Sequence, residues 1–195
     1  MIQAKDVDEL MRKRRSVFQN QYSGKQVDDR IVKQMLENAN WAPTHKLTEP
    51  WRFIVYTGEG LKKLAQQQAE VYKKVTTADQ SFKEDRYQNL LTKPMLSSHI
   101  IVVGMKRDEK KSLPEIEEIG AVFCAVENMY LTAAANGVGC YLSTGGVTYF
   151  EEAKEAFGLA KEDILIGFFH IGMPKGDLPD GRRKPVESKV QWVSS

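Results

Sequence analysis

Residues 114–136 form the segment that most constrains the fold, because the helix they predict is apolar on more than one side. Pro114 suits a first helical turn, and the glutamates that follow it complement the positive N-terminus of a helix. Between Phe123 and Ala135 the apolar side chains occupy both sides of this helix. A helix that is apolar nearly all round is buried. The segment therefore predicts either a central helix of the domain or a helix at a subunit interface.

The remaining segments carry the patterns of an α+β protein. Apolar residues recur at helical spacing over residues 28–39 and 61–72, and Asp28 is placed to cap the first of these helices. Short apolar runs predict strands at residues 53–56, 99–105, 140–142 and 164–171. We expect a mixed, largely antiparallel sheet of about four or five strands with helices on both faces. The polar residues 76–98 predict a mobile helical excursion or lid.

Composition and length exclude several classes of protein. The chain has 195 residues, 42% of them apolar, which predicts a single domain over residues 1–195 with a tail from about residue 173. A net charge of +2 gives no case for a nucleic-acid partner. No apolar run is long enough for a signal peptide or a membrane span, so we expect a cytoplasmic protein. Cys124 and Cys140 lack metal-site spacing, so we expect buried free thiols and no metal site.

Residues 42–52 connect a predicted helix to a predicted strand and are unusually mixed in chemistry. Pro43 and Pro50 stiffen the backbone, and Trp51 supplies an aromatic surface. Hydrogen-bond donors and an acceptor lie between the prolines, on Thr44, His45 and Lys46. This combination would suit a flat polar ligand. The alternative is an ordinary surface loop in which Pro50 and Trp51 pack against the edge of the core.

A helix is predicted before residue 12, because Val7, Leu10 and Met11 share one face at helical spacing, and four consecutive basic residues, 12–15, end it. Holding their charges together is unfavourable without an anion, which favours a binding site for a negatively charged group. The alternative is a solvated helix end, where cations complement the negative C-terminus of the helix.

In combination, these segments resemble the nitroreductase family of FMN-dependent enzymes, over nearly the whole chain from Arg14 to about Trp192. Each motif is weak alone, and their order and separation together carry the resemblance. The motifs are Arg14-Arg15-Ser16, Ala42–Lys46, Pro50–Phe53, the small-residue helix around 120–139, and Arg182–Pro185. The chain is most similar to a compact subgroup with a Pro-X-His-Lys loop.

The resemblance implies a homodimer with two FMN sites at the subunit interface. It implies that Arg14, Arg15 and Ser16 hold the phosphate and ribityl chain, and that Arg183 contacts the phosphate from the tail. It implies that the loop of Pro43, Thr44, His45 and Lys46 meets the flavin of the partner subunit. Two cofactor-binding positions depart from the subgroup pattern. Trp41 stands where an arginine is common, and Leu142-Ser143-Thr144 stands where Trp-Arg-Ser is common.

The same resemblance implies the reaction. Electrons pass from NAD(P)H to a nitroaromatic, a quinone or a related small oxidant by a ping-pong mechanism, without a catalytic side chain. No glycine-rich nucleotide fingerprint follows a predicted strand, so we expect NAD(P)H to share the flavin face with the oxidant. Two alternatives remain open. One is an FMN-binding protein with low turnover, and the other is a reductive dehalogenase or ene-reductase on the same scaffold.

Overall fold

A single antiparallel sheet forms the centre of the structure, a computed structural model that describes residues 3–194. Its strands are β1 (Trp51–Thr57), β2 (His99–Met105), β3 (Gly139–Ser143) and β4 (Ile164–Gly172), in the order β1-β2-β4-β3. The three pairings between these strands are antiparallel. A parallel pairing occurs only as an isolated bridge between Ser16 and Cys140 within the described residues. The predicted sheet is therefore confirmed, and its mixed character is limited to this bridge.

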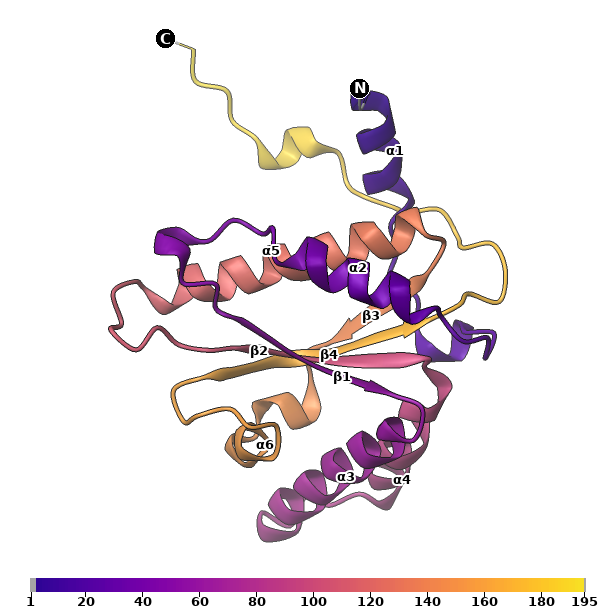
Figure 1. Cartoon of the computed structure of the whole chain (residues 1–195), viewed down its shortest axis with the longest axis vertical. Helices are drawn as coiled ribbons and strands as arrows, with labels where there is room; N and C mark the ends of the chain where they lie inside the picture. The colour runs from indigo at the N-terminus through magenta and orange to yellow at the C-terminus, as the bar shows by residue number, and fades with distance from the viewer. Residues whose placement is uncertain (1–2, 195) are drawn as a thin grey trace.

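Helices cover both faces of the sheet, as predicted. They are α1 (Ala4–Lys13), α2 (Asp29–Ala39), α3 (Gly60–Ala78), α4 (Glu84–Thr92), α5 (Glu115–Ala135) and α6 (Glu151–Ala156). Short 3₁₀ turns are η1 (Gln19–Gln21), η2 (His45–Leu47), η3 (Lys93–Leu96), η4 (Gly146–Tyr149) and η5 (Val186–Lys189). Figure 1 shows α2 and α5 on one face, with α3, α4 and α6 on the other. α1 projects from the body near the C-terminal tail (Figure 1).

The core has two parts, separated by the sheet, and β2 contributes to both. Every residue of β2 is buried. Alternate side chains of a strand point to opposite faces. Ile101 and Val103 accordingly pack with the α2–α5 side, and Ile100 and Val102 pack with the α3–α6 side. An unbroken apolar run was therefore the correct signal for a central strand covered on both faces.

α5 is buried on one side only within a single chain. It begins directly after Pro114, as predicted, and its inner side packs through Val122, Ala125 and Met129. Its outer side leaves Ile116 71% exposed and Phe123 45% exposed. The expectation of two buried thiols is half wrong, because Cys140 is buried whereas Cys124 lies on this outer side and is exposed. An apolar helix face that one chain leaves uncovered agrees with the interface alternative.

A buried ion pair fixes the start of α5. Glu118 is only 1% exposed, and its carboxylate contacts the guanidinium of Arg107. The same carboxylate accepts a 2.9 Å hydrogen bond from the backbone N–H of Asp108, and Arg107 donates to the carbonyl of Leu113 at 2.8 Å. Since each charged group has several partners, the loop between β2 and α5 is held in one arrangement.

The polar segment 76–98 is helical, as predicted. α4 and η3 occupy most of it and pack against α3. The predicted cap of α2 is also confirmed, because the Asp28 carboxylate accepts a 2.8 Å hydrogen bond from the N–H of Arg30. The mobility that we expect of α4 stays a prediction.

Candidate functional site

Arg14 and Arg15 follow directly after α1, and their side chains contact different parts of the structure. Arg14 lies 5.2 Å from the centre of the Tyr130 ring, and its Nε is 3.5 Å from a carboxylate oxygen of Glu127. The guanidinium of Arg15 turns to the tail, where Nε donates to the carbonyl of Pro179 at 3.1 Å. The sequence predicted one basic site here, but the two guanidinium groups have different partners.

Ser16 and Tyr130 cover the outer edge of β3. Ser16 forms the parallel bridge to Cys140, and the N–H of Val17 donates to the Cys140 carbonyl at 2.8 Å. Tyr130 reaches the same edge from α5 and accepts a 2.7 Å hydrogen bond from the N–H of Leu142. Burial raises the pKa of the Tyr130 phenol, and its hydrogen bonds to Leu142 and Ser16 partly oppose that rise. The predicted ribityl-binding residue Ser16 is therefore fixed against β3.

Arg15 and Arg183 line one surface hollow of about 980 Å³ between α1 and the tail. Its lining has five cationic side chains against three carboxylates, namely Lys5, Arg12, Lys13, Arg15 and Arg183 against Asp8, Glu9 and Asp180. The excess of positive charge favours an anion. A side chain on Gly181 would lie 2.6 Å from Arg15 Cζ, so the tail can approach Arg15 closely only because this residue is glycine.

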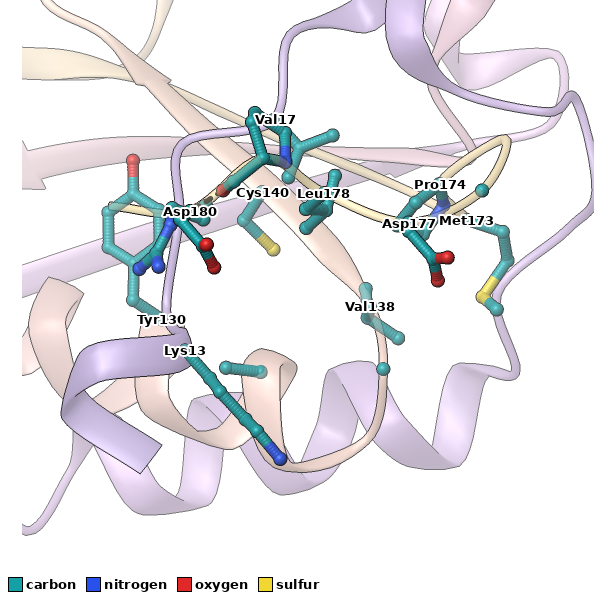
Figure 2. A pocket seen from close by; sticks show the side chains of 15 residues that line it. Lys13, Val17, Tyr130, Val138, Cys140, Met173, Pro174, Asp177, Leu178 and Asp180 are labelled. Atoms are coloured by element: carbon teal, nitrogen blue, oxygen red, sulfur yellow. Dashed lines mark hydrogen bonds between the residues drawn. The ribbon is translucent and has the colours of Figure 1, made fainter. Parts of the chain in front are cut away.

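A second pocket, of about 580 Å³, lies where the tail crosses the end of α5 and the start of β3. Figure 2 shows Tyr130 and Asp180 at one side of this pocket and Met173 and Asp177 at the other. Arg15 lines this pocket as well as the first hollow, so it lies between the two spaces.

Ser143 lines a third cavity, of about 500 Å³, at the opposite end of β3. Leu142 and Ser143 are half-buried, whereas Thr144 is exposed and its carbonyl accepts a 2.9 Å hydrogen bond from Thr148 Oγ1. The cavity lies between β4, α3, α4 and η4, and its polar lining includes Gln19, Gln68, Arg86, Lys93 and His170. Of the three cofactor-binding positions 142–144 that the resemblance implies, Ser143 lines this cavity.

Two buried polar residues of this cavity were not among the predicted site residues. Gln68 is 4% exposed, and its Nε2 has no hydrogen-bond partner among residues 3–194. His170 is 5% exposed, and its Nδ1 lies 3.2 Å from both Gln19 Nε2 and Ser97 Oγ. Burial lowers the pKa of His170 to about 4. The sequence signal for Gln68 was its place on the otherwise apolar face of α3.

The loop at residues 42–52 is bonded to the start of α5. His45 Nδ1 lies 2.6 Å from Glu117 Oε2, and Lys46 Nζ donates to the carbonyl of Ser112 at 3.1 Å. Thr44 is half-buried, and Pro43 and Trp41 are exposed. Pro50 and Trp51 are buried at the edge of the core, as the surface-loop alternative expected, and Trp51 Nε1 donates to Asn40 Oδ1 at 3.0 Å.

One chain does not bring the two halves of the predicted site together. His45 is held at Glu117, near the beginning of α5, whereas Arg14 and Ser16 lie at Tyr130. Thirteen residues of α5 separate Glu117 from Tyr130, which is about 20 Å at 1.5 Å per residue. The His45 loop and the Arg14–Ser16 segment therefore cannot enclose the same end of a small molecule within one subunit.

Residues 3–194 contain no cluster of three or more His, Cys, Asp or Glu residues arranged to hold a metal ion. They also contain no helix with the length and apolar character needed to cross a membrane.

Comparisons with known proteins agree on one family. Residues 11–173 match the profile of the nitroreductase family. YdjA of Escherichia coli K12, provisionally named an NAD(P)H nitroreductase, is 31% identical over 134 residues, which are 69% of this chain and 70% of YdjA. The crystal structure of a nitroreductase-like family protein from Bacillus cereus is similar over 100% of both chains, with a TM-score of 0.83 and 26% identity.

A further crystal structure shows the same fold with a bound cofactor. It is a provisionally named nitroreductase from Desulfovibrio desulfuricans in complex with FMN. It matches over 100% of this chain and 99% of its own, with a TM-score of 0.70 and 22% identity. At 22% identity, the similarity between the two structures establishes a shared fold and nothing further.

Proposed function

This chain belongs to the nitroreductase family, and from that membership we propose that it is an FMN-dependent oxidoreductase that uses NAD(P)H. Its electron acceptor is a nitroaromatic, a quinone or a related small oxidant. The name of YdjA supports the choice of donor, and the FMN complex of the Desulfovibrio protein supports the choice of cofactor. The observation that carries the proposal is a pair of spaces: the hollow with excess positive charge that Arg15 and Arg183 line, and the polar cavity that Ser143 lines at the end of β3.

These spaces fit the two ends of FMN. Arg15 contacts carbonyl oxygens of the chain rather than a carboxylate, so its charge remains available to a phosphate. From Cys140, beside Ser16, to Ser143 is three residues, or about 10 Å along the strand. That is the scale of the ribityl chain that joins the phosphate of FMN to its ring.

The proposed roles follow from these positions. Arg15 and Arg183 bind the phosphate, Ser16 lies beside the ribityl chain, and residues 142–144 face the ring. Arg14 holds Tyr130 against the edge of β3 and adds positive charge there. When bound, FMN supplies a group that takes up and gives away a hydride, so no side chain acts as nucleophile. NAD(P)H and the oxidant bind in turn at one face, which is a ping-pong order.

The active unit in this proposal is a homodimer. In one chain the His45 loop and the Arg14–Ser16 segment contact points of α5 that lie about 20 Å apart, so a site with both requires a second copy. The uncovered side chains of α5, Ile116 and Phe123, supply apolar surface for that contact. The loop of Pro43, Thr44, His45 and Lys46 then meets the flavin of the partner, with Trp41 at its edge.

The absorption spectrum of the purified protein tests this function. We expect a yellow protein that releases FMN and not FAD, loses its colour when NADH or NADPH is added without oxygen, and regains it with a quinone or nitroaromatic. Colourless protein that does not take up added FMN would overturn the proposal. Yellow protein that NAD(P)H does not bleach would instead favour the alternative of an FMN-binding protein with low turnover.

A further inference from the structure

The cavity at the Ser143 end of β3 contains a buried amide group with an unused donor. Gln68 lines it from α3, is 96% buried and has no partner for Nε2 among residues 3–194. A buried polar group without a hydrogen bond lowers the stability of the fold. Such a group is expected where a ligand completes the hydrogen bond.

His170 supplies a second neutral donor to the same cavity. Its Nδ1 faces the amide of Gln19, whose Nε2 can only donate, so Nδ1 is the acceptor. The proton of the neutral imidazole is therefore on Nε2. Because burial lowers the pKa of His170 to about 4, the ring is neutral near pH 7.

The rest of the lining suits a flat, uncharged ring. Tyr72 and Phe168 are both buried aromatic side chains in the wall of the cavity. The charged side chains of the lining, Asp85, Arg86 and Lys93, come from α4 and η3 and are exposed. The buried interior therefore offers aromatic surface and neutral hydrogen-bonding groups, without a buried charge.

We propose that Gln68 and His170 bind the imide edge of the FMN ring, where two carbonyl oxygens flank an N–H group. The amide of Gln68 matches that edge, because it donates through Nε2 and accepts through Oε1. The Nε2–H group of His170 donates to a ring carbonyl. This inference rests on the proposed function, and it gives to two buried residues a role that the sequence motifs do not include.

The substitution Gln68→Leu tests the proposal, because leucine has a similar volume and no hydrogen-bonding group. We expect FMN to bind at least tenfold more weakly, measured by the FMN fluorescence that holoprotein releases on dilution. We also expect a lower midpoint potential, since donors to the ring stabilise its more electron-rich state. A tenfold change in the ratio of the protein's affinities for reduced and oxidised FMN corresponds to about 30 mV for a two-electron couple.

Stability separates this role from a structural one. After FMN is removed by dialysis, the melting temperature of Gln68→Leu should equal or exceed that of the wild type, because the variant no longer buries an unpartnered amide. If Gln68 only supported the fold, the variant would melt lower and its FMN would keep the wild-type potential. Gln68→Met provides the same comparison if the leucine variant does not fold.

Gln66→Leu is the matched control, because Gln66 lies on the exposed side of the same helix and bonds to Glu70. It should leave FMN affinity and potential unchanged. A Gln68→Leu variant with the wild-type dissociation constant and potential would overturn this inference and leave the proposed function intact. Wild-type protein that binds no FMN would overturn the proposed function and this inference with it.

Discussion

His45 and Glu117 are joined by a short hydrogen bond, with 2.6 Å between Nδ1 and Oε2. The bond ties the loop after α2 to the first turn of α5, and Lys46 adds a second tie to the carbonyl of Ser112. Lys46 and Leu47 have positive φ angles of 52° and 53°, a backbone conformation that residues other than glycine rarely adopt. The loop is thus held in an unfavourable local conformation by contacts with α5, which pre-organises it for the partner subunit in our proposal.

Glu117→Gln is therefore expected to loosen this loop with little effect on global stability. Both side chains are about half exposed, and such pairs contribute roughly 0.2–1 kcal/mol. Hydrogen exchange of the amides of residues 44–49 should become faster, while the melting temperature stays close to wild type. Glu115→Gln in the same helical turn is the control. Unchanged exchange in the Glu117 variant would show that the bond does not order the loop.

Arg15→Ala is expected to weaken FMN binding by about 1.5–3 kcal/mol, which is a loss of ten- to over a hundredfold. The reason is the loss of a charge-assisted contact with the phosphate. Fluorescence titration with FMN measures the effect, and Arg30→Ala, at an exposed arginine on α2 that pairs with Asp28, serves as control. An unchanged dissociation constant for the Arg15 variant would mean that the phosphate binds elsewhere.

A mixed dimer tests whether each site uses two chains. If Arg15→Ala and His45→Ala each abolish activity as homodimers, a dimer with one copy of each has both defects in one site and none in the other. Such dimers, isolated with two different tags, should recover about half of the wild-type activity per dimer.

The mixed-dimer experiment can also contradict a site built from two chains. If the mixed dimers are as inactive as the two parent homodimers, then either both residues belong to the site of one chain or the His45 loop does not contact the flavin. Thermal melts of both single variants near the wild-type value must come first, because an unfolded subunit would also give no activity.

Glu118→Ala is expected to destabilise the fold far more than the neighbouring Glu117→Ala. Its carboxylate is fully buried, and its loss leaves the largely buried guanidinium of Arg107 without its counter-ion. Breaking a buried pair in this way costs roughly 3–5 kcal/mol, against at most about 1 kcal/mol for the exposed Glu117. Urea unfolding of the two variants makes the comparison. Equal losses for both would show that the buried pair does not hold the loop.

Acid should destabilise the fold through His170 before the carboxylates titrate. Burial lowers the pKa of this residue from 6.5 in the unfolded chain to about 4 in the fold. In that window the unfolded chain binds more protons, so the free energy of unfolding falls as the pH is lowered from 6.5 toward 4. At about 1.4 kcal/mol per pKa unit, the full loss is on the order of 3 kcal/mol.

Urea unfolding at about pH 7 and about pH 5 measures this loss. His170→Gln should flatten the pH dependence, because the variant has no imidazole at this buried position. A His170→Gln variant with the wild-type slope would assign the acid sensitivity to other groups.

Much of the sheet could be predicted from local sequence, because β2 and β4 are apolar runs that helices cover on both faces. The bounds of β1 were predicted less well, because strand pairing decides them. β1 begins at Trp51, two residues before the predicted start, because Trp51 pairs with Met105. The exposure of Cys124 was missed because a helix pattern does not tell whether one chain or two cover an apolar face.

The candidate site was predictable in parts. Arg14 and Arg15 were found as neighbours in sequence, but in the fold one contacts Tyr130 and the other the tail, which composition cannot show. Gln68 and His170 come from elements about a hundred residues apart, and only the folded chain puts them at one cavity. The roles of the predicted residues toward FMN stay predictions until binding is measured.

The distance along α5 between Glu117 and Tyr130 has a consequence for how such a chain can change in length. Inserting or deleting one residue between them would shift the two attachment points by about 1.5 Å and rotate one against the other by about 100°. The His45 loop and the covered edge of β3 would then no longer align with the partner subunit of the dimer that we propose. In related sequences, insertions and deletions should therefore accumulate in the tail and in the loops, while this stretch of helix keeps its number of residues.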